Sequence, residues 1–314
     1  MKKIFLLCTL LLSSCNDKYV EPLVFGAVTW PGYEPAYVAR ELGYLTEERV
    51  HLAEFTNTTE VLRAFRNGKL HIAGLTLDEA LVLRKDIPDL QIFLVADFSS
   101  GADMLMAHRG IHNLNQLKGK RIGVEKTALG AYFLSLILHE ARLSAKDIQV
   151  ISLPLDEHVQ AFRTDKVDAV VTFGLAVEAL KREGAGILFD SSQTPGKIVD
   201  TLVVRASSAE THEAQLHEFT EAWFRGLDAI RQDQARTYPF MAQHEQVSKA
   251  EIAATLGGLK LIDKPGNMKQ ITGNPPPLQV TASKIQSVLK EEGLSVGSDD
   301  LSHLLTSHFI EAHP

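Results

Sequence analysis

The stretch LVFGAV-TWPGYE-PAYVARELG, residues 23–43, decides the fold of this chain. Its first six residues are largely apolar and predict a buried strand. Pro35 suits the first turn of a helix, the residues after it continue that helix, and Gly43 supplies the left-handed residue that ends it. A strand that leads through a short loop into a helix is typical of a βαβ unit, in which the next strand lies parallel to the first.

The alternation of strands and helices continues along the chain and predicts an α/β fold. In the first part we expect strands at 50–55, 71–75 and 90–96, with helices at 59–66 and 78–85. After residue 120 the pattern recurs, with strands at 121–124, 149–153, 167–173 and 186–189 and helices at 128–141, 156–165 and 175–182. This repetition predicts two lobes of similar plan, each with a largely parallel sheet.

A short internal match marks the borders of the second lobe. Asp103–His108 and Asp200–Arg205 both read Asp-x-Leu-x-x-basic, and we interpret them as two extended segments that cross between the lobes. Residues 23–104 and 201–314 then form lobe 1, and residues 105–200 form lobe 2. Beyond Arg205, apolar residues recur at helical spacing and predict helices at 210–232, 249–256, 278–292 and 300–306.

Residues 1–14 predict a lipoprotein signal peptide. Lys2 and Lys3 precede a short apolar run that cannot span a membrane as a helix. Leu12-Ser13-Ser14-Cys15 resembles the bacterial lipobox, in which the Cys is acylated and becomes the new N-terminus. The alternative is an ordinary secretory signal with an incidental Cys. We expect residues 15–22 to form a tether and the lipid on Cys15 to hold an extracytoplasmic domain to the membrane.

Charge and motifs exclude several classes of function. The 314 residues include 32 Lys and Arg against 39 Asp and Glu, a formal net charge of −7, and no basic stripe that could bind nucleic acid. The chain has neither a phosphate-binding P-loop nor a Gly-x-Ser-x-Gly elbow. The pairs His108/His112 and His212/His217 lack the further ligands that a zinc site requires. We therefore predict no metal and no cofactor.

The loop and helix after the first strand carry a family resemblance. Trp30-Pro31-Gly32-Tyr33-Glu34-Pro35, followed by Gly43-Tyr44-Leu45, resembles the opening of the nitrate/sulfonate/taurine-type substrate-binding proteins of ABC importers. That group is similar to the binding proteins for thiamine pyrimidine precursors. NLNQLKGKRIGV at 113–124 and KVDAV at 166–170 resemble the second lobe of the same family. The resemblance implies a type II periplasmic binding fold, in which two α/β lobes joined by two crossing strands hold a ligand in the cleft between them.

The loops that follow the strands hold the candidate ligand-binding residues, because ligands of open α/β sheets collect beyond the carboxyl ends of the strands. The rings of Trp30 and Tyr33 can stack on a planar ligand or enclose a cation, or one of them can pack under the loop as core. The helix start at Thr127 and Gly130 offers amides that bind either an anion or only water. The candidates from other strand ends are Thr76 and Phe173.

Acidic side chains dominate these loops. They are Glu34, Asp78, Asp97, Asp103, Glu125 and Asp200. Lys126 is the only Lys or Arg in the core of the loops, and Lys197 lies further out. Several carboxylates around an anion would repel it, whereas a cation would relieve their mutual repulsion. We therefore predict a cationic or amine-bearing, nitrogen-containing ligand; the alternative is that most of these acids cap helices and face away from it.

These observations predict a lipid-anchored solute-binding protein that closes around a small molecule and delivers it to an ABC permease. A second hypothesis from another class is a sensor module that presents the closed form to a membrane-bound receptor. Neighbouring genes would separate the two, since a permease and an ATPase favour transport. An enzyme on the same fold is a weaker hypothesis, because the Cys-rich motif of the related pyrimidine synthases is absent.

Overall fold

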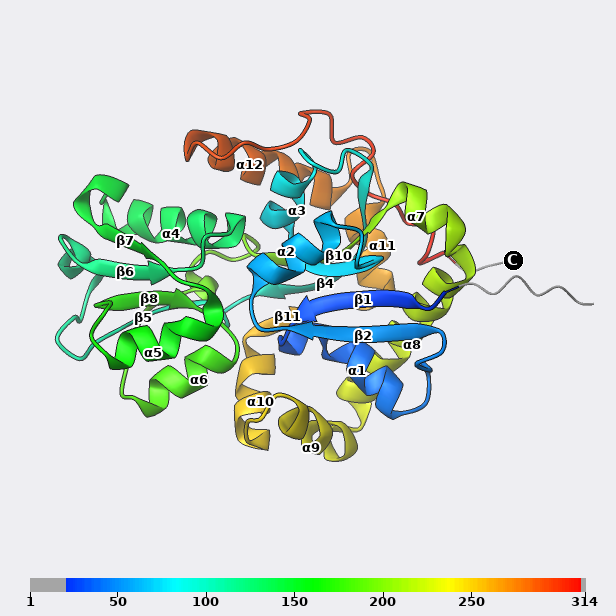
Figure 1. Ribbon diagram of the computed structural model, residues 1–314, viewed down its shortest axis with the longest axis horizontal. Helices are drawn as coiled ribbons and strands as arrows, with labels where there is room; N and C mark the ends of the chain where they lie inside the picture. Colours follow the sequence, from blue (N-terminus) through cyan, green and yellow to red (C-terminus); the bar gives the residue numbers. More distant parts are fainter. Residues whose placement is uncertain (1–20, 312–314) are drawn as a thin grey trace, which may run out of the picture.

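A computed structural model of the chain describes residues 21–311. Figure 1 shows two α/β lobes lying side by side, and the chain passes between them twice. The predicted signal peptide, Cys15 and residues 16–20 of the predicted tether lie outside the described residues. Within residues 21–311, no helix is both long enough and apolar enough to cross a membrane.

Lobe 1 is built on a six-stranded sheet with the order β11-β4-β10-β3-β1-β2. Its strands are β1 (Leu23–Val28), β2 (Val50–Phe55), β3 (Ile72–Thr76), β4 (Leu90–Ser99), β10 (Val199–Arg205) and β11 (Leu259–Leu261). Strand β1 pairs in parallel with β2 and β3, as the opening βαβ pattern predicts. Strand β10 runs antiparallel between β3 and β4, so the chain returns from lobe 2 as an inner strand of the lobe 1 sheet.

Lobe 2 is built on a five-stranded sheet with the order β7-β6-β8-β5-β9. Its strands are β5 (Met104–Ala107), β6 (Arg121–Val124), β7 (Gln149–Ser152), β8 (Ala169–Thr172) and β9 (Gly186–Asp190). Strand β6 is parallel to β7 and β8, and β5 runs antiparallel between β8 and β9. In both lobes, the antiparallel inner strand is the one that directly follows a passage between the lobes.

Helices cover both faces of each sheet (Figure 1). Those of lobe 1 are α1 (Glu34–Glu41), α2 (Thr58–Arg66), α3 (Leu77–Leu83), α7 (Ala206–Thr211), α8 (Glu213–Gln232), α9 (Gln234–His244), α10 (Lys249–Gly257), α11 (Lys264–Ile271) and α12 (Pro277–Glu291). Those of lobe 2 are α4 (Ala128–Ala141), α5 (His158–Arg163) and α6 (Leu175–Arg182). In the core of lobe 1, the ring of Phe25 on β1 lies 5.5 Å from that of Phe219 on α8.

Two connections join the lobes, residues 100–103 between β4 and β5 and residues 191–198 between β9 and β10. A hydrogen bond of 2.8 Å between the hydroxyls of Ser99 and Ser191 ties them together, and the amide of Gly101 donates to the same Ser191 oxygen. The matching segments Asp103–His108 and Asp200–Arg205 lie largely within β5 and β10, directly after the crossings. The match therefore marks the strands that receive each crossing chain.

The helix predicted at 300–306 is wrong. This segment contains turns and an isolated parallel bridge between Ile92 and Leu305. The amide of Ile92 donates to the carbonyl of Leu304 at 2.7 Å, and the amide of Thr306 donates back to Ile92 at 3.0 Å. These backbone groups are used in pairing with β4 and cannot also form a helix. The short elements α7, α9, α11 and β11 were not predicted, since their apolar spacing is weak and α9 contains a proline, Pro239.

Candidate functional site

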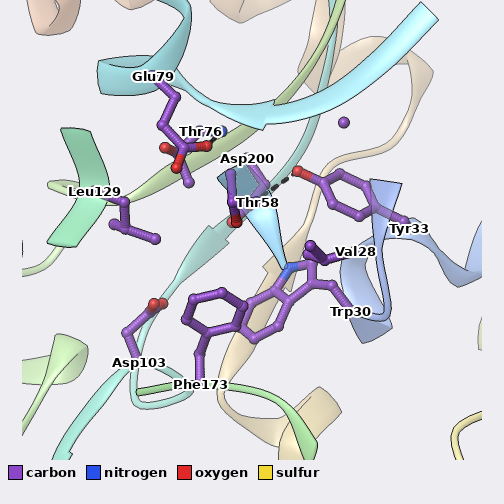
Figure 2. A pocket seen from close by; sticks show the side chains of 11 residues that line it. Val28, Trp30, Tyr33, Thr58, Thr76, Glu79, Asp103, Leu129, Phe173 and Asp200 are labelled. Carbon is purple, nitrogen blue, oxygen red and sulfur yellow. Dashed lines mark hydrogen bonds between the residues drawn. The ribbon is translucent and has the colours of Figure 1, made fainter. Parts of the chain in front are cut away.

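A small cavity lies between the lobes, next to the two connections. Figure 2 shows side chains from both lobes pointing into it. Lobe 1 contributes Val28, Trp30, Tyr33, Thr58, Gly74, Thr76, Glu79 and Asp200, the first connection contributes Asp103, and lobe 2 contributes Leu129 and Phe173. The predicted residues Trp30, Tyr33, Thr76, Asp103, Phe173 and Asp200 are thus brought together around one space.

A row of polar side chains crosses the lobe 1 sheet at the edge of this cavity. In the register of the sheet, Asp200 on β10 lies between Thr76 on β3 and Asp97 on β4. The hydroxyl of Tyr33 donates to Asp200 Oδ1 at 3.0 Å, and the indole of Trp30 donates to Asp97 Oδ2 at 3.2 Å. The loop after β1 is therefore fixed to the two carboxylates of the row, Asp200 and Asp97.

The close fit of that loop depends on Gly32. A Cβ atom at this position would lie 1.9 Å from Asp97 Oδ2 and 2.6 Å from the indole nitrogen of Trp30. Any side chain here would separate Trp30 from Asp97. Gly32 therefore lets the aromatic loop approach the carboxylate row.

The carboxylates at this end of lobe 1 are buried and incompletely hydrogen-bonded. Asp103 Oδ2, Glu79 Oε1, Asp97 Oδ1 and both carboxylate oxygens of Asp78 are buried with no hydrogen-bond partner among the described residues. Burial raises the pKa of Asp97, Asp103 and Asp78 to about 7 in each case. Burial, together with the charges of Asp97 and Asp103, raises the pKa of Asp200 well above its ordinary value. Ionised carboxylates here lack a compensating charge.

None of the described residues that line the cavity is Lys, Arg or His. Lys126 and Lys197, the two bases near the predicted loops, are both exposed. The unmet acceptors of Asp103 and Glu79, the two carboxylates of that set that line the cavity, therefore face a space that no cationic side chain of the lining neutralises. Buried charges without a partner are costly, so this arrangement favours a positively charged occupant.

The rings of Trp30 and Phe173 form an apolar corner of the cavity (Figure 2). Their centroids are 5.7 Å apart and their planes are nearly perpendicular at 89°. Trp30 belongs to lobe 1, whereas Phe173 follows β8 of lobe 2, so the pair forms across the cleft. Aromatic faces in this position can contact a planar group or a cation.

Further contacts hold the lobes together around the cavity. Glu125 Oε1 of lobe 2 accepts hydrogen bonds from the amide and the hydroxyl of Thr59 in lobe 1, at 3.0 and 2.9 Å. The side-chain amide of Asn57 donates to Asp156 Oδ1 at 3.2 Å. Beside the first connection, where α6 and α10 lie next to Gly101 and Ala102, Arg182 is 3.4 Å from Glu251. The structure is therefore a closed form of the two lobes.

Five of the sequence-predicted residues do not line this cavity. Glu34 turns to the far side of α1, where its Oε1 lies 2.6 Å from His244 Nδ1. Although burial opposes it, hydrogen bonds to Glu34 and Glu54 raise the pKa of His244 to about 10. Thr127 caps α4 by accepting from the amide of Gly130 at 3.2 Å. Asp78 is buried in the first turn of α3, and Glu125 is hydrogen-bonded across the cleft to Thr59.

Other lining residues were not predicted as ligand contacts. Glu79 follows Thr76 at capping-box spacing, and its Oε2 accepts from the Thr76 amide at 3.1 Å. In the sequence this pattern indicates only a helix cap. It gives no sign that the other oxygen of Glu79, Oε1, is buried without a hydrogen-bond partner. Thr58 follows β2, so the strand-end rule itself could have found it. Val28, Gly74 and Leu129 carry no chemical signal in the sequence.

Comparison with known proteins identifies the family of the chain. The family model of NMT1/THI5-like proteins matches residues 30–237. The chain is 25% identical over 294 residues to the taurine-binding periplasmic protein of Escherichia coli K12, covering 88% of this chain and 90% of that protein.

Solved structures share the fold at lower identity. A ligand-binding component of an ABC-type import system from Staphylococcus aureus, solved with zinc bound, has a TM-score of 0.77 at 12% identity and covers 93% of this chain and 98% of its own. The alkanesulfonate-binding protein of Xanthomonas axonopodis pv. citri bound to MOPS has a TM-score of 0.73 at 17% identity, covering 91% and 100%.

The predicted two-lobed periplasmic binding fold is confirmed by these structures, and the predicted family resemblance is confirmed by the family match. The relatives named here are binding proteins, and the chain itself belongs to the NMT1/THI5-like family.

Proposed function

We propose that this protein captures a small organic cation or amine in the cleft and delivers it to an ABC importer from the outer face of a membrane. The observation that carries the proposal is the set of buried carboxylates around the cavity, whose described lining offers no basic side chain. The proposed ligand-contacting residues are Trp30, Tyr33, Thr58, Thr76, Glu79, Asp103, Phe173 and Asp200.

Electrostatics favours a cation over an anion in this cavity. A sulfonate or nitrate needs Arg, Lys, hydroxyl or amide donors, and bringing it beside Asp103, Glu79 and Asp200 adds repulsion at low effective dielectric. A cation supplies the missing partner of the same carboxylates. Taurine, the ligand in the name of the relative from Escherichia coli, carries both an amine and a sulfonate, and this cavity suits only the amine.

An organic cation fits better than a metal ion. Within residues 21–311, the group of three His, Cys, Asp or Glu side chains whose ligand atoms all lie within 4.8 Å of one another is found elsewhere in lobe 1. The cavity carboxylates are more widely spread, and the corner of Trp30 and Phe173 offers an aromatic surface instead. Aminopyrimidines, guanidine derivatives, polyamines and quaternary amines combine positive charge with the shape that such a site holds.

Closure of the lobes supplies the mechanism. The two predicted bodies, residues 23–104 with 201–314 and residues 105–200, would move relative to one another, and their borders lie at the starts of β5 and β10. Because lobe 1, the connection and lobe 2 all contribute to the cavity, only the closed form gives a ligand its full set of contacts. The ligand therefore shifts the population toward the closed form, which a permease can distinguish from the open one.

A ligand screen tests the proposal. We expect calorimetry to find an amine or organic cation that binds with a dissociation constant of about 1 μM or tighter. The same compound should raise the melting temperature by mass action and decrease the radius of gyration in solution scattering. Alkanesulfonates and nitrate serve as the anionic comparison set. Micromolar binding of an alkanesulfonate together with no binding of any amine would contradict the proposed ligand class.

The lipid anchor is a separate part of the proposal and rests on the sequence Leu12-Ser13-Ser14-Cys15. Replacing Cys15 with Ala should abolish incorporation of labelled fatty acid and move the protein from the membrane fraction to the soluble extracytoplasmic fraction. Replacing Cys8, which lies inside the signal segment, with Ala is the matched control and should change neither result. A Cys15→Ala protein that stays lipid-labelled would exclude Cys15 as the anchor.

A further inference from the structure

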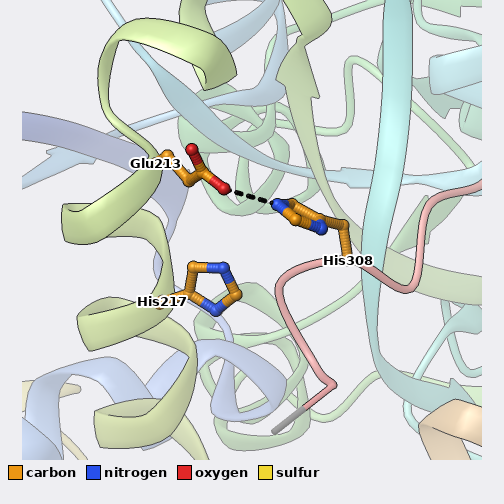
Figure 3. Close-up of side chains that lie close together, drawn as sticks. All are labelled: Glu213, His217 and His308. Atoms are coloured by element: carbon orange, nitrogen blue, oxygen red, sulfur yellow. Dashed lines mark hydrogen bonds and ion pairs between the residues drawn. The ribbon is translucent and has the colours of Figure 1, made fainter. Parts of the chain in front are cut away.

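Three potential metal ligands meet on the surface of lobe 1, away from the ligand cavity. They are Glu213 and His217 on α8 and His308 in the segment that follows the β4 bridge. One ligand atom from each side chain lies within 4.8 Å of the other two. Figure 3 shows the carboxylate and the two imidazoles turned toward one another.

The chain places these groups by two independent means. Glu213 and His217 are four residues apart, so α8 presents them on one face. His308 comes from far along the sequence and is held by its neighbours, because Phe309 packs against Phe93 with a centroid distance of 5.9 Å. The pairing of Leu305 with Ile92 fixes the same segment to β4. The three groups are therefore already assembled before any metal binds.

We propose that Glu213, His217 and His308 form a binding site for a divalent transition-metal ion, with Zn²⁺ as the best match. Two imidazole nitrogens and one carboxylate oxygen are a ligand set that zinc accepts, and a water molecule completes the tetrahedron. Hard cations such as Mg²⁺ and Ca²⁺ prefer sites made only of oxygen atoms. The carboxylate of Glu213 lies 2.7 Å from His308 Nε2, so a metal ion would take the place of the proton that now links them.

Metal binding would fasten the C-terminal segment to α8. The ring of Phe309 already lies 5.3 Å from that of His217. The metal would therefore add a bond between two segments that side-chain packing holds close together. Because only the folded form assembles the three ligands, zinc should stabilise the protein by mass action. The site lies outside the cavity lining, so this effect does not depend on which solute the cleft binds.

The test titrates Zn²⁺ into the exported protein, purified without a polyhistidine tag and treated with a chelator. Calorimetry should show one saturable site, and Co²⁺ in its place should give the visible absorption of tetrahedral coordination. His308→Ala and Glu213→Gln should each weaken Zn²⁺ binding at least about tenfold. His303→Ala is the matched control, because His303 is an exposed histidine on the same segment, and it should bind Zn²⁺ like the unaltered protein.

Melting curves of the metal-free variants show whether each still folds, and His217→Ala supplies a second imidazole variant. The expected pattern is a Zn²⁺-dependent rise in melting temperature that His308→Ala and His217→Ala lose and His303→Ala keeps. Absence of saturable binding in the unaltered protein would overturn the proposal. Equal Zn²⁺ affinity in His303→Ala and His308→Ala would overturn it as well, since the metal would then be bound elsewhere.

Discussion

Replacing Asp200 with Asn should weaken binding of the amine ligand at least about 100-fold, because it removes one charge of a buried ion pair. Asn is nearly isosteric with Asp and keeps an oxygen that can accept the hydrogen bond from Tyr33, so the shape of the cavity is preserved. The measurement is calorimetry with the tightest amine from the screen, at a pH near 8, which is above the pKa of about 7 of Asp97 and Asp103.

The same variant should make the ligand-free protein more stable. Burial and the charges of Asp97 and Asp103 raise the pKa of Asp200, so its ionised form is disfavoured in the folded state. A group whose pKa is raised by folding costs nothing at a pH below its unfolded pKa, and its cost grows as the pH rises from there toward the folded pKa. The gain in melting temperature from Asp200→Asn should therefore be larger at pH 8 than at pH 5.

Glu125→Gln is the matched control for this pair of effects. Glu125 is also a buried acid at the lobe interface, but it lies outside the cavity lining, and Gln can still accept the two hydrogen bonds from Thr59. It should change ligand affinity by less than about threefold, within the scatter of neutral substitutions. If Asp200→Asn bound the amine as tightly as the unaltered protein, the charge argument for the ligand would fail.

Replacing Gly226 with Ala should destabilise the protein by about 2 kcal/mol, although Ala is the better helix former by about 1 kcal/mol. Gly226 lies where α8 crosses α1, and a Cβ there would lie 2.1 Å from the carbonyl oxygen of Pro35 and 3.1 Å from the amide of Ala39. Both neighbours are backbone atoms of α1, so the clash is relieved only if the two helices separate.

Denaturant unfolding measures this loss, and Gly257→Ala provides the control. Gly257 ends α10 with open space around its missing Cβ, so the same substitution should leave stability unchanged or raise it by about 0.5 kcal/mol. Because α1 begins directly after the loop that carries Trp30, separation of the helices should also weaken ligand binding. A stabilised Gly226→Ala protein would mean that α1 and α8 pack less tightly than these distances indicate.

Local patterns predicted much of the fold. The bounds of β2, Val50–Phe55, and of α4, Ala128–Ala141, agree with the sequence analysis to the residue. Apolar runs and helix caps act within a few residues, so they can be found without knowledge of the fold. The predicted 300–306 helix failed because its residues pair with Ile92, which is more than 200 positions earlier and leaves no local signal.

The strand-end rule predicted several residues that the structure places around the candidate cavity. It brought Trp30, Thr76 and Asp200 together because the sheet itself sets their positions. Glu34 is also in a loop after a strand, but α9 supplies His244 on the opposite side and the carboxylate turns there. Which way a side chain turns at a helix start depends on such distant partners.

The group of Glu213, His217 and His308 illustrates the same limit. The sequence analysis paired His212 with His217, which are five residues apart on different helix faces, and found no supporting ligand. The third side chain of the group comes from the C-terminal segment, whose position depends on the bridge to β4. Clusters of this kind depend on tertiary contacts and are visible only in three dimensions.

The tie between Ser99 and Ser191 gives the molecule a fulcrum. The cavity lies beside it, since Asp103 is on one connection and Asp200 follows the other. Asn57, which follows the edge strand β2, meets Asp156 on the side of the sheet away from β4 and β10. In a lever, a small displacement near the pivot becomes a long arc at the far end of the arm. In the proposed mechanism, a ligand that draws the lobes together by a fraction of an ångström beside this pivot would move the edge where Asn57 meets Asp156 much further. We therefore expect a partner that distinguishes the loaded protein to contact that edge.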